Sequence, residues 1–144
     1  IPIVFTNGKS TLNVIKKLTQ EGIKLNITAI FLMKQIEFIL QDIKKTENIL
    51  SIFAGRLYDS GIDAKNKMNE INKYVHDNSN CQTLWASTRM VYDYKQAAEV
   101  DTDIITMQID HVKKMKLFKL DAMDYSIKTV KQFYDDASES GFNF

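Results

Sequence analysis

Short apolar segments rich in β-branched residues alternate along the chain with longer segments in which apolar residues recur at helical spacing. This alternation predicts βαβ units, in which each strand is followed by a helix. Most of the apolar runs are almost uninterrupted, as is typical of strands buried on both faces of a parallel sheet. The predicted strands cover residues 1–5, 25–31, 49–54, 83–87 and 104–107.

The intervening segments carry apolar stripes that would dock helices on this sheet. Two stripes are formed by Ile36, Ile39, Leu40 and Ile43, and by Ala64, Met68, Ile71 and Val75. A last helix is predicted over residues 125–138, with a face of Ile127, Val130, Tyr134 and Ala137. Ser10 is expected to cap the first helix, and Gly22 to end it in the left-handed conformation.

Neither a linker nor a low-complexity tract interrupts this rhythm, so residues 1–144 are predicted to form a single α/β domain or part of one. Periodicity alone leaves two architectures open, an open doubly wound sheet and a barrel. The glycine-rich nucleotide motifs of open sheets, G-x-G-x-x-G and G-x-x-x-x-G-K-[ST], are absent from the sequence. Their absence favours the barrel.

Composition narrows the functional classes. Hydrophobic residues make up 44% of the chain, and 19 basic residues against 18 acidic ones give a net charge of +1. This profile indicates a soluble globular protein without the positive surplus that nucleic-acid binding requires. No apolar run approaches the roughly 20 residues that span a bilayer, so we expect a cytoplasmic protein without a membrane partner.

Cysteine and histidine offer little chemistry. Cys81 is the single cysteine, which excludes a disulfide within the chain. His76 and His111 lack the spacing of metal ligands, which predicts surface roles and no metal. The chain opens on Ile1, inside an apolar run and without methionine, so we expect further residues of the same protein before Ile1.

Polar side chains gather along the predicted strands and at their carboxyl ends, where parallel α/β folds place their working groups. Asn26 and Thr28 lie two residues apart, so both leave their strand on the same side. A repeated design follows on the later strands, with a hydroxyl and an arginine in Ser51-Ile-Phe-Ala-Gly-Arg56 and in Ser87-Thr-Arg89. Because guanidinium can bind phosphate oxygens bidentately, two arginines at one mouth predict a phosphate clamp.

Three segments in register resemble the last strands of the transaldolase family of class I aldolases: NITAIF at 26–31, SIFAGRLYD at 51–59 and WASTR at 85–89. The opening Ile1-Pro2-Ile3 resembles the family's catalytic strand, just after its lysine. The resemblance implies a (β/α)8 barrel, of which this chain is the carboxyl-terminal part with about five strands. It also implies transfer of a dihydroxyacetone unit from a ketose phosphate donor to an aldose phosphate acceptor through a lysine Schiff base, without metal or organic cofactor.

Roles carry over residue by residue. The resemblance assigns the sugar phosphate to Arg56, Ser87 and Arg89. It assigns the hydroxyls of the dihydroxyacetone unit to Asn26 and Ser51, and the catalytic water to Thr28. The Schiff-base lysine would precede Ile1, so the chain by itself is expected to be inactive.

Two other functions stay open. A fructose 6-phosphate aldolase is one, although Phe53, a substrate-binding position, favours transaldolase because the aldolase branch has tyrosine there. A noncatalytic sugar-phosphate-binding half barrel is the other, since Lys9, Lys24 and Lys34 lie on or beside helices or at the wrong strand end. An open half barrel is also expected to self-associate, so a homo-oligomer is allowed.

Departures from the family raise two further questions. The family's acidic residues of earlier strands have no counterpart here. The turn before the last strand reads Val100-Asp101-Thr102-Asp103 where the family tends to have glycine, which leaves its geometry open.

Asp59 follows Arg56 by three residues and could orient that arginine or cap the next segment. Tyr92, Tyr94, Phe133 and Tyr134 are expected to pack rather than to stack on bases.

Overall fold

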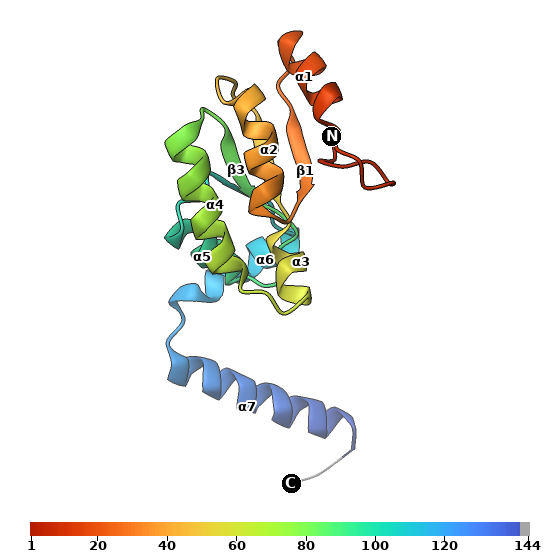
Figure 1. The fold of residues 1–144 in the computed structure, drawn as a ribbon. Helices are drawn as coiled ribbons and strands as arrows, with labels where there is room; N and C mark the ends of the chain where they lie inside the picture. The colour runs from red at the N-terminus through yellow and green to blue at the C-terminus, as the bar shows by residue number, and fades with distance from the viewer. Residues whose placement is uncertain (142–144) are drawn as a thin grey trace. The chain divides into compact units, whose positions relative to one another are not determined.

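A computed structural model describes residues 1–141 of the chain (Figure 1). Its strands are β1 (Asn26–Ile30), β2 (Ile49–Ile52), β3 (Gln82–Trp85) and β4 (Ile104–Ile105). Its helices are α1 (Leu12–Gln20), α2 (Met33–Ile43), α3 (Ala54–Asp59), α4 (Ala64–Asn78), α5 (Asp93–Glu99), α6 (Ile109–Lys114), the 3₁₀ helix η1 (Met115–Lys119) and α7 (Ala122–Glu139).

The strands form one parallel sheet with the order β1-β2-β3-β4. Strands and helices alternate along the chain, as in a partial (β/α) barrel. Four strands are formed within the described residues, against about five predicted. The sheet stays open among the described residues, because β1 and β4 do not pair with each other.

The first predicted strand, residues 1–5, is wrong in extent. Only a bridge at Pro2 continues the sheet beyond β1, supported by bonds from Ile3 N to Thr28 O (2.9 Å) and from Thr28 N to Ile1 O (2.8 Å). The chain then turns back, with Phe5 N donating to Lys9 O at 2.8 Å. This early turn leaves only residues 1–3 beside β1.

The sheet and its helices share one apolar core. Ile36, Ile39, Leu40 and Ile43 on α2 are at most 1% exposed, and the predicted stripe of α4 is equally buried. Figure 1 shows α2 and α4 on one side of the sheet. The first residues of β1, β2 and β3, Asn26, Ile49 and Gln82, are exposed or half-buried, whereas all later residues of β2 and β3 are buried. The sheet is therefore exposed at its amino edge and buried towards the carboxyl ends of β2 and β3.

Of the two local predictions at α1, the one for Gly22 is confirmed and the one for Ser10 is wrong by one residue. Ser10 Oγ accepts the N–H of Leu12 at 3.1 Å, although the cap residue itself is Thr11. Gly22 has φ +77° and follows the end of α1, where Ile23 N bonds to Leu18 O at 3.1 Å.

The turn before β4 has a non-glycine residue in the left-handed region. Asp101 takes φ +53°, and Thr102 N donates to Ala97 O at 3.0 Å. Aspartate tolerates the left-handed region better than most residues, at a cost of about 1 kcal/mol. Asp101 therefore forms this left-handed turn without glycine.

The chain divides into two compact units, residues 1–108 and 109–144. The first contains the sheet, and whether both units form a single domain stays a prediction. Within the second, α7 confirms the predicted last helix, but Ile127, Val130, Phe133 and Tyr134 are 60 to 65% exposed, so the expected packing is not seen. Among residues 1–141, no helix has the length and apolarity needed to cross a membrane.

Candidate active site

Arg89 stands on the turn that follows β3, and its backbone is held in place from two directions. Asp93, which is fully buried, accepts the N–H groups of Arg89 (2.6 Å) and Met90 (3.1 Å) with one carboxylate oxygen. Thr88 Oγ1 donates to Thr106 O at 3.0 Å, which ties this turn to the end of β4. The position of Arg89 is therefore set by the fold, while its side chain extends outward.

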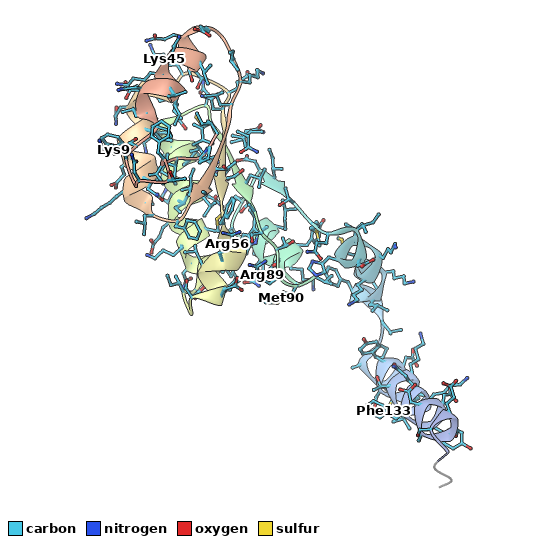
Figure 2. The ribbon with its side chains drawn as sticks, turned by 90° about the vertical axis from the view of Figure 1, so that its right-hand side faces the viewer. Lys9, Lys45, Arg56, Arg89, Met90 and Phe133 are labelled. Carbon is cyan, nitrogen blue, oxygen red and sulfur yellow. The ribbon has the colours of Figure 1, made fainter. Side chains whose placement is uncertain are left out.

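Arg56 reaches the same edge from α3. The predicted strand over residues 49–54 is shorter than expected: β2 ends at Ile52, and Arg56 lies in the first turn of α3. Gly55 allows the start of α3 to approach the turn after β3 closely. A Cβ at this position would lie 1.6 Å from Ser87 O and 3.1 Å from Arg89 Cγ. Figure 2 shows Arg56 and Arg89 next to each other at this end of the sheet.

Asp59 pairs with Arg89. The sequence had suggested instead that Asp59 orients Arg56 or caps the next segment. Arg89 Nε donates to both carboxylate oxygens at 3.0 Å, and Arg89 Nη2 donates to Oδ2. These bonds hold the pKa of the Asp59 carboxyl below its usual range and raise the pKa of Arg89. Asp63, rather than Asp59, caps the next helix by accepting Asn66 N at 3.1 Å.

Phe53 supports the other arginine. The guanidinium carbon of Arg56 lies 5.3 Å from the centre of the Phe53 ring, within cation–π range. Phe31 in turn packs on Phe53, with ring centres 5.8 Å apart. The predicted substrate-binding residue Phe53 thus borders the arginine edge through an aromatic contact.

A cavity of about 310 Å³ opens between the turns that follow β3 and β4. Its lining comprises Ser87, Thr88, Arg89, Thr106, Met107 and Gln108. Ser87 takes φ +65°, a conformation that strains a non-glycine residue and is common at functional sites. Thr106 and Gln108 were missed in the sequence, although they repeat the two-residue spacing of Ser87 and Arg89.

The other predicted residues lie within β1 and β2, before the ends of these strands. Ser51 Oγ donates to Asn26 Oδ1 at 2.6 Å, so these two residues do meet. Asn26 is the first residue of β1, nearer the amino edge than the arginines. Thr28 lies beside residues 1–3 through its backbone bonds, and Ala29 after it has φ +58°. The predicted set thus falls into an arginine group and an Asn26–Ser51 group.

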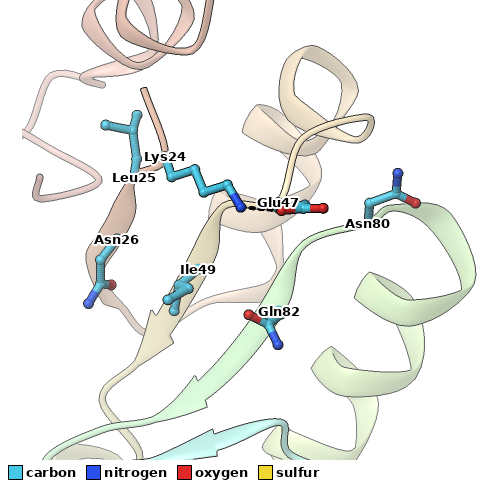
Figure 3. A pocket seen from close by; sticks show the side chains of 7 residues that line it. All are labelled: Lys24, Leu25, Asn26, Glu47, Ile49, Asn80 and Gln82. Carbon is cyan, nitrogen blue, oxygen red and sulfur yellow. Dashed lines mark hydrogen bonds and ion pairs between the residues drawn. The ribbon is translucent and has the colours of Figure 1, made fainter. Parts of the chain in front are cut away.

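A larger cavity, of about 550 Å³, lies at the amino edge (Figure 3). Lys24 and Glu47 form an ion pair there, next to Gln82 and Asn80. It lacks the arginines and the strained turn of the smaller cavity. Lys24 is engaged with Glu47, and Lys9 and Lys34 are exposed, so none of the three has the desolvated surroundings of a Schiff-base lysine.

The remaining candidates have structural roles. His76 Nε2 lies 2.8 Å from Asp103 Oδ2, which also accepts Thr83 N at 2.7 Å. Cys81 is 4% exposed, and burial raises the pKa of its thiol, which opposes a nucleophilic role. Residues 1–141 contain no cluster of three or more histidine, cysteine or acidic side chains that could hold a metal ion.

Comparison with known proteins relates the whole chain to one family. The family model described as Transaldolase/Fructose-6-phosphate aldolase matches residues 1–144. A protein named "Probable transaldolase" from Bdellovibrio bacteriovorus is 32% identical over 123 residues, covering 85% of this chain and 54% of that relative.

Two Bartonella proteins with the same name show similar coverage. The one from Bartonella tribocorum is 38% identical over 94 residues, covering 64% of this chain and 42% of its own. The one from Bartonella henselae is 29% identical over 145 residues, covering 99% and 61%. The chain therefore spans about half the length of the curated relatives it matches.

Proposed function

The chain belongs to the transaldolase/fructose-6-phosphate aldolase family, and we propose that it is the carboxyl-terminal half of a transaldolase barrel. The complete protein would transfer a dihydroxyacetone unit from a ketose phosphate to an aldose phosphate. The lysine that carries this unit would precede Ile1. No metal or organic cofactor takes part in the proposal.

The observation that carries the proposal is the convergence of two arginines on one carboxyl edge, beside a cavity of about 310 Å³ that Arg89 lines. In (β/α)8 barrels a phosphate site is frequently built by the loops after the seventh and eighth strands. For a carboxyl-terminal half, those strands are β3 and β4. Arg56 and Arg89 would bind the sugar phosphate, with Ser87 as a further donor.

The donor carbonyl would react beside β1, away from the arginines. The amino group of Ile1 donates to Asn26 O at 2.7 Å, so a residue before Ile1 would continue beside β1, near Asn26. A lysine there would condense with the donor's C2 carbonyl and release water. Cleavage of the C3–C4 bond would then release an aldose phosphate and leave an enamine, which would attack the acceptor aldehyde. Water would hydrolyse the resulting Schiff base, which releases the new ketose phosphate and frees the lysine. Asn26 and Ser51 would hold the hydroxyls of the retained unit, and Thr28 the water.

Borohydride trapping tests the proposal. The complete protein is incubated with fructose 6-phosphate, reduced, digested and analysed by mass spectrometry. We expect a reduced dihydroxyacetone adduct on the lysine before Ile1, and none on residues 1–144 alone. An adduct on Lys9, Lys24 or Lys34, or no adduct on the complete protein, would contradict the assignment.

Two alternatives remain distinguishable. The absence of a desolvated lysine among the described residues favours a noncatalytic sugar-phosphate-binding half barrel for the chain by itself. An aldolase would release free dihydroxyacetone, whereas a transaldolase would pass the unit to erythrose 4-phosphate. Phe53, whose ring contacts Arg56 rather than offering a hydroxyl, supports the transaldolase.

A further inference from the structure

The two arginines at the carboxyl edge are held by different kinds of partner. Arg56 lies over the Phe53 ring, and within residues 1–141 no carboxylate oxygen comes within 4.0 Å of its side-chain nitrogens. Arg89 instead forms a fork-to-fork pair with Asp59, through Nε and Nη2. An aromatic ring leaves the guanidinium edges open, whereas a carboxylate occupies one of them.

This pairing depends on a specific contact between α3 and the turn after β3. Gly55 allows the approach, because any side chain at that position would overlap Ser87 O. Asp59 and Arg89 are 30 residues apart in sequence, and their side chains are 52% and 41% exposed. An exposed arginine explores many rotamers unless a partner fixes it. The bidentate pair fixes the plane of the guanidinium and leaves Nη1 and part of Nη2 for a ligand.

We infer that Asp59 is a positioning residue for Arg89, and that it sets the preference for phosphorylated over unphosphorylated sugars. This inference rests on the proposed function. Asp59 occupies one edge of Arg89, and the free nitrogens of Arg89 bind phosphate in the cavity that this arginine lines. Asp59 itself does not contact the substrate.

An opposing effect has to be weighed, since the Asp59 carboxylate also repels phosphate. At a separation of about 6 Å in a water-exposed site, this repulsion changes affinity by about threefold and is weakened further by salt. Losing a fixed guanidinium is the larger effect, at roughly tenfold, because the free side chain must be ordered again on binding. Orientation therefore outweighs repulsion, and removing the carboxylate weakens binding.

The test is Asp59→Asn in the complete protein, with fructose 6-phosphate and unphosphorylated fructose as donors. We expect the KM for fructose 6-phosphate to rise by roughly tenfold, with kcat and the kinetics with fructose little changed. Asp59→Glu, which keeps the charge, should recover part of the loss. An unchanged or lower KM for fructose 6-phosphate in Asp59→Asn would overturn the inference.

Asp63→Asn is the matched control, because Asp63 also lies near α3 but caps α4 and does not contact either arginine. Asparagine is an equally good cap, so this variant should keep the wild-type KM. The NMR signal of the Arg89 Nε–H gives a readout that mere loss of stability would not move. It should shift and broaden in Asp59→Asn and stay in place in Asp63→Asn.

Titration with inorganic phosphate separates failure of the inference from failure of the proposed function. If Arg89→Ala weakens phosphate binding and Asp59→Asn does not, the positioning role is wrong and the phosphate site stands. If the wild-type protein binds no phosphate and transfers nothing from fructose 6-phosphate, the proposed function fails, and the inference with it. Weaker binding in both variants supports the positioning role.

Discussion

The two edges of the sheet carry polar groups of different kinds. At the amino edge, Asn48 is 1% exposed, and its Oδ1 accepts the N–H of Leu25 at 2.8 Å. At the carboxyl edge, the Arg89 side chain is 41% exposed and pairs with Asp59. Asp103 repeats the first pattern by accepting Thr83 N at 2.7 Å. Amino-edge polar groups thus fasten strands to their neighbours. The carboxyl edge instead presents cations around a strained turn. In barrel enzymes, likewise, the amino-terminal face serves stability and the carboxyl-terminal face holds the active site.

Among the substitutions considered, Gly55→Ala should disturb the carboxyl edge most. The new Cβ would lie 1.6 Å from Ser87 O, so α3 must move away from the turn after β3. We expect unfolding in urea to become easier by about 4 kcal/mol, together with weaker binding of fructose 6-phosphate. Gly61→Ala is the control: its φ is +77° with no atom within 4 Å, so only conformational strain of about 1 kcal/mol should appear. Equal effects of the two variants would contradict the role of Gly55.

Asn48→Ala tests whether the amino edge contributes to stability rather than to binding. It leaves the N–H of Leu25 without its acceptor in a part-buried site, which should lower the free energy of unfolding by about 2 to 3 kcal/mol. Asn7→Ala removes the same kind of bond, to Lys9 N, in an exposed turn and should cost below about 1 kcal/mol. Urea denaturation measures both variants. A changed affinity for fructose 6-phosphate in Asn48→Ala would argue against an amino edge devoted to stability.

Periodicity was sufficient to predict most of the fold. The alternation of apolar runs and helical stripes located β1 to β4, α2, α4 and α7, because burial on the sheet imposes that spacing. It failed at residues 1–5, where the run is apolar but the chain turns back after Ile3. It also extended the strand at 49–54 into α3, because Ala54 is as buried as a strand residue would be.

The candidate site was predictable only in part. The recurrence of a hydroxyl followed by an arginine after two successive strands pointed to Arg56 and Arg89, because this pattern is local in the sequence. The pair between Asp59 and Arg89 could not be predicted, because it depends on the close approach of two segments at Gly55. Asp101 shows the same limit, since its left-handed conformation follows from the turn rather than from residue type.

The most direct test of the account compares two exposed cations at opposite edges of the sheet. Arg89 borders the cavity of about 310 Å³, and Lys24 borders the larger one of about 550 Å³. The dissociation constant for fructose 6-phosphate is measured for the complete protein and for Arg89→Ala and Lys24→Ala. The account predicts roughly thirtyfold weaker binding for Arg89→Ala, about 2 kcal/mol, and wild-type binding for Lys24→Ala. Equal losses in the two variants, or a loss confined to Lys24→Ala, would contradict a phosphate site at the carboxyl edge.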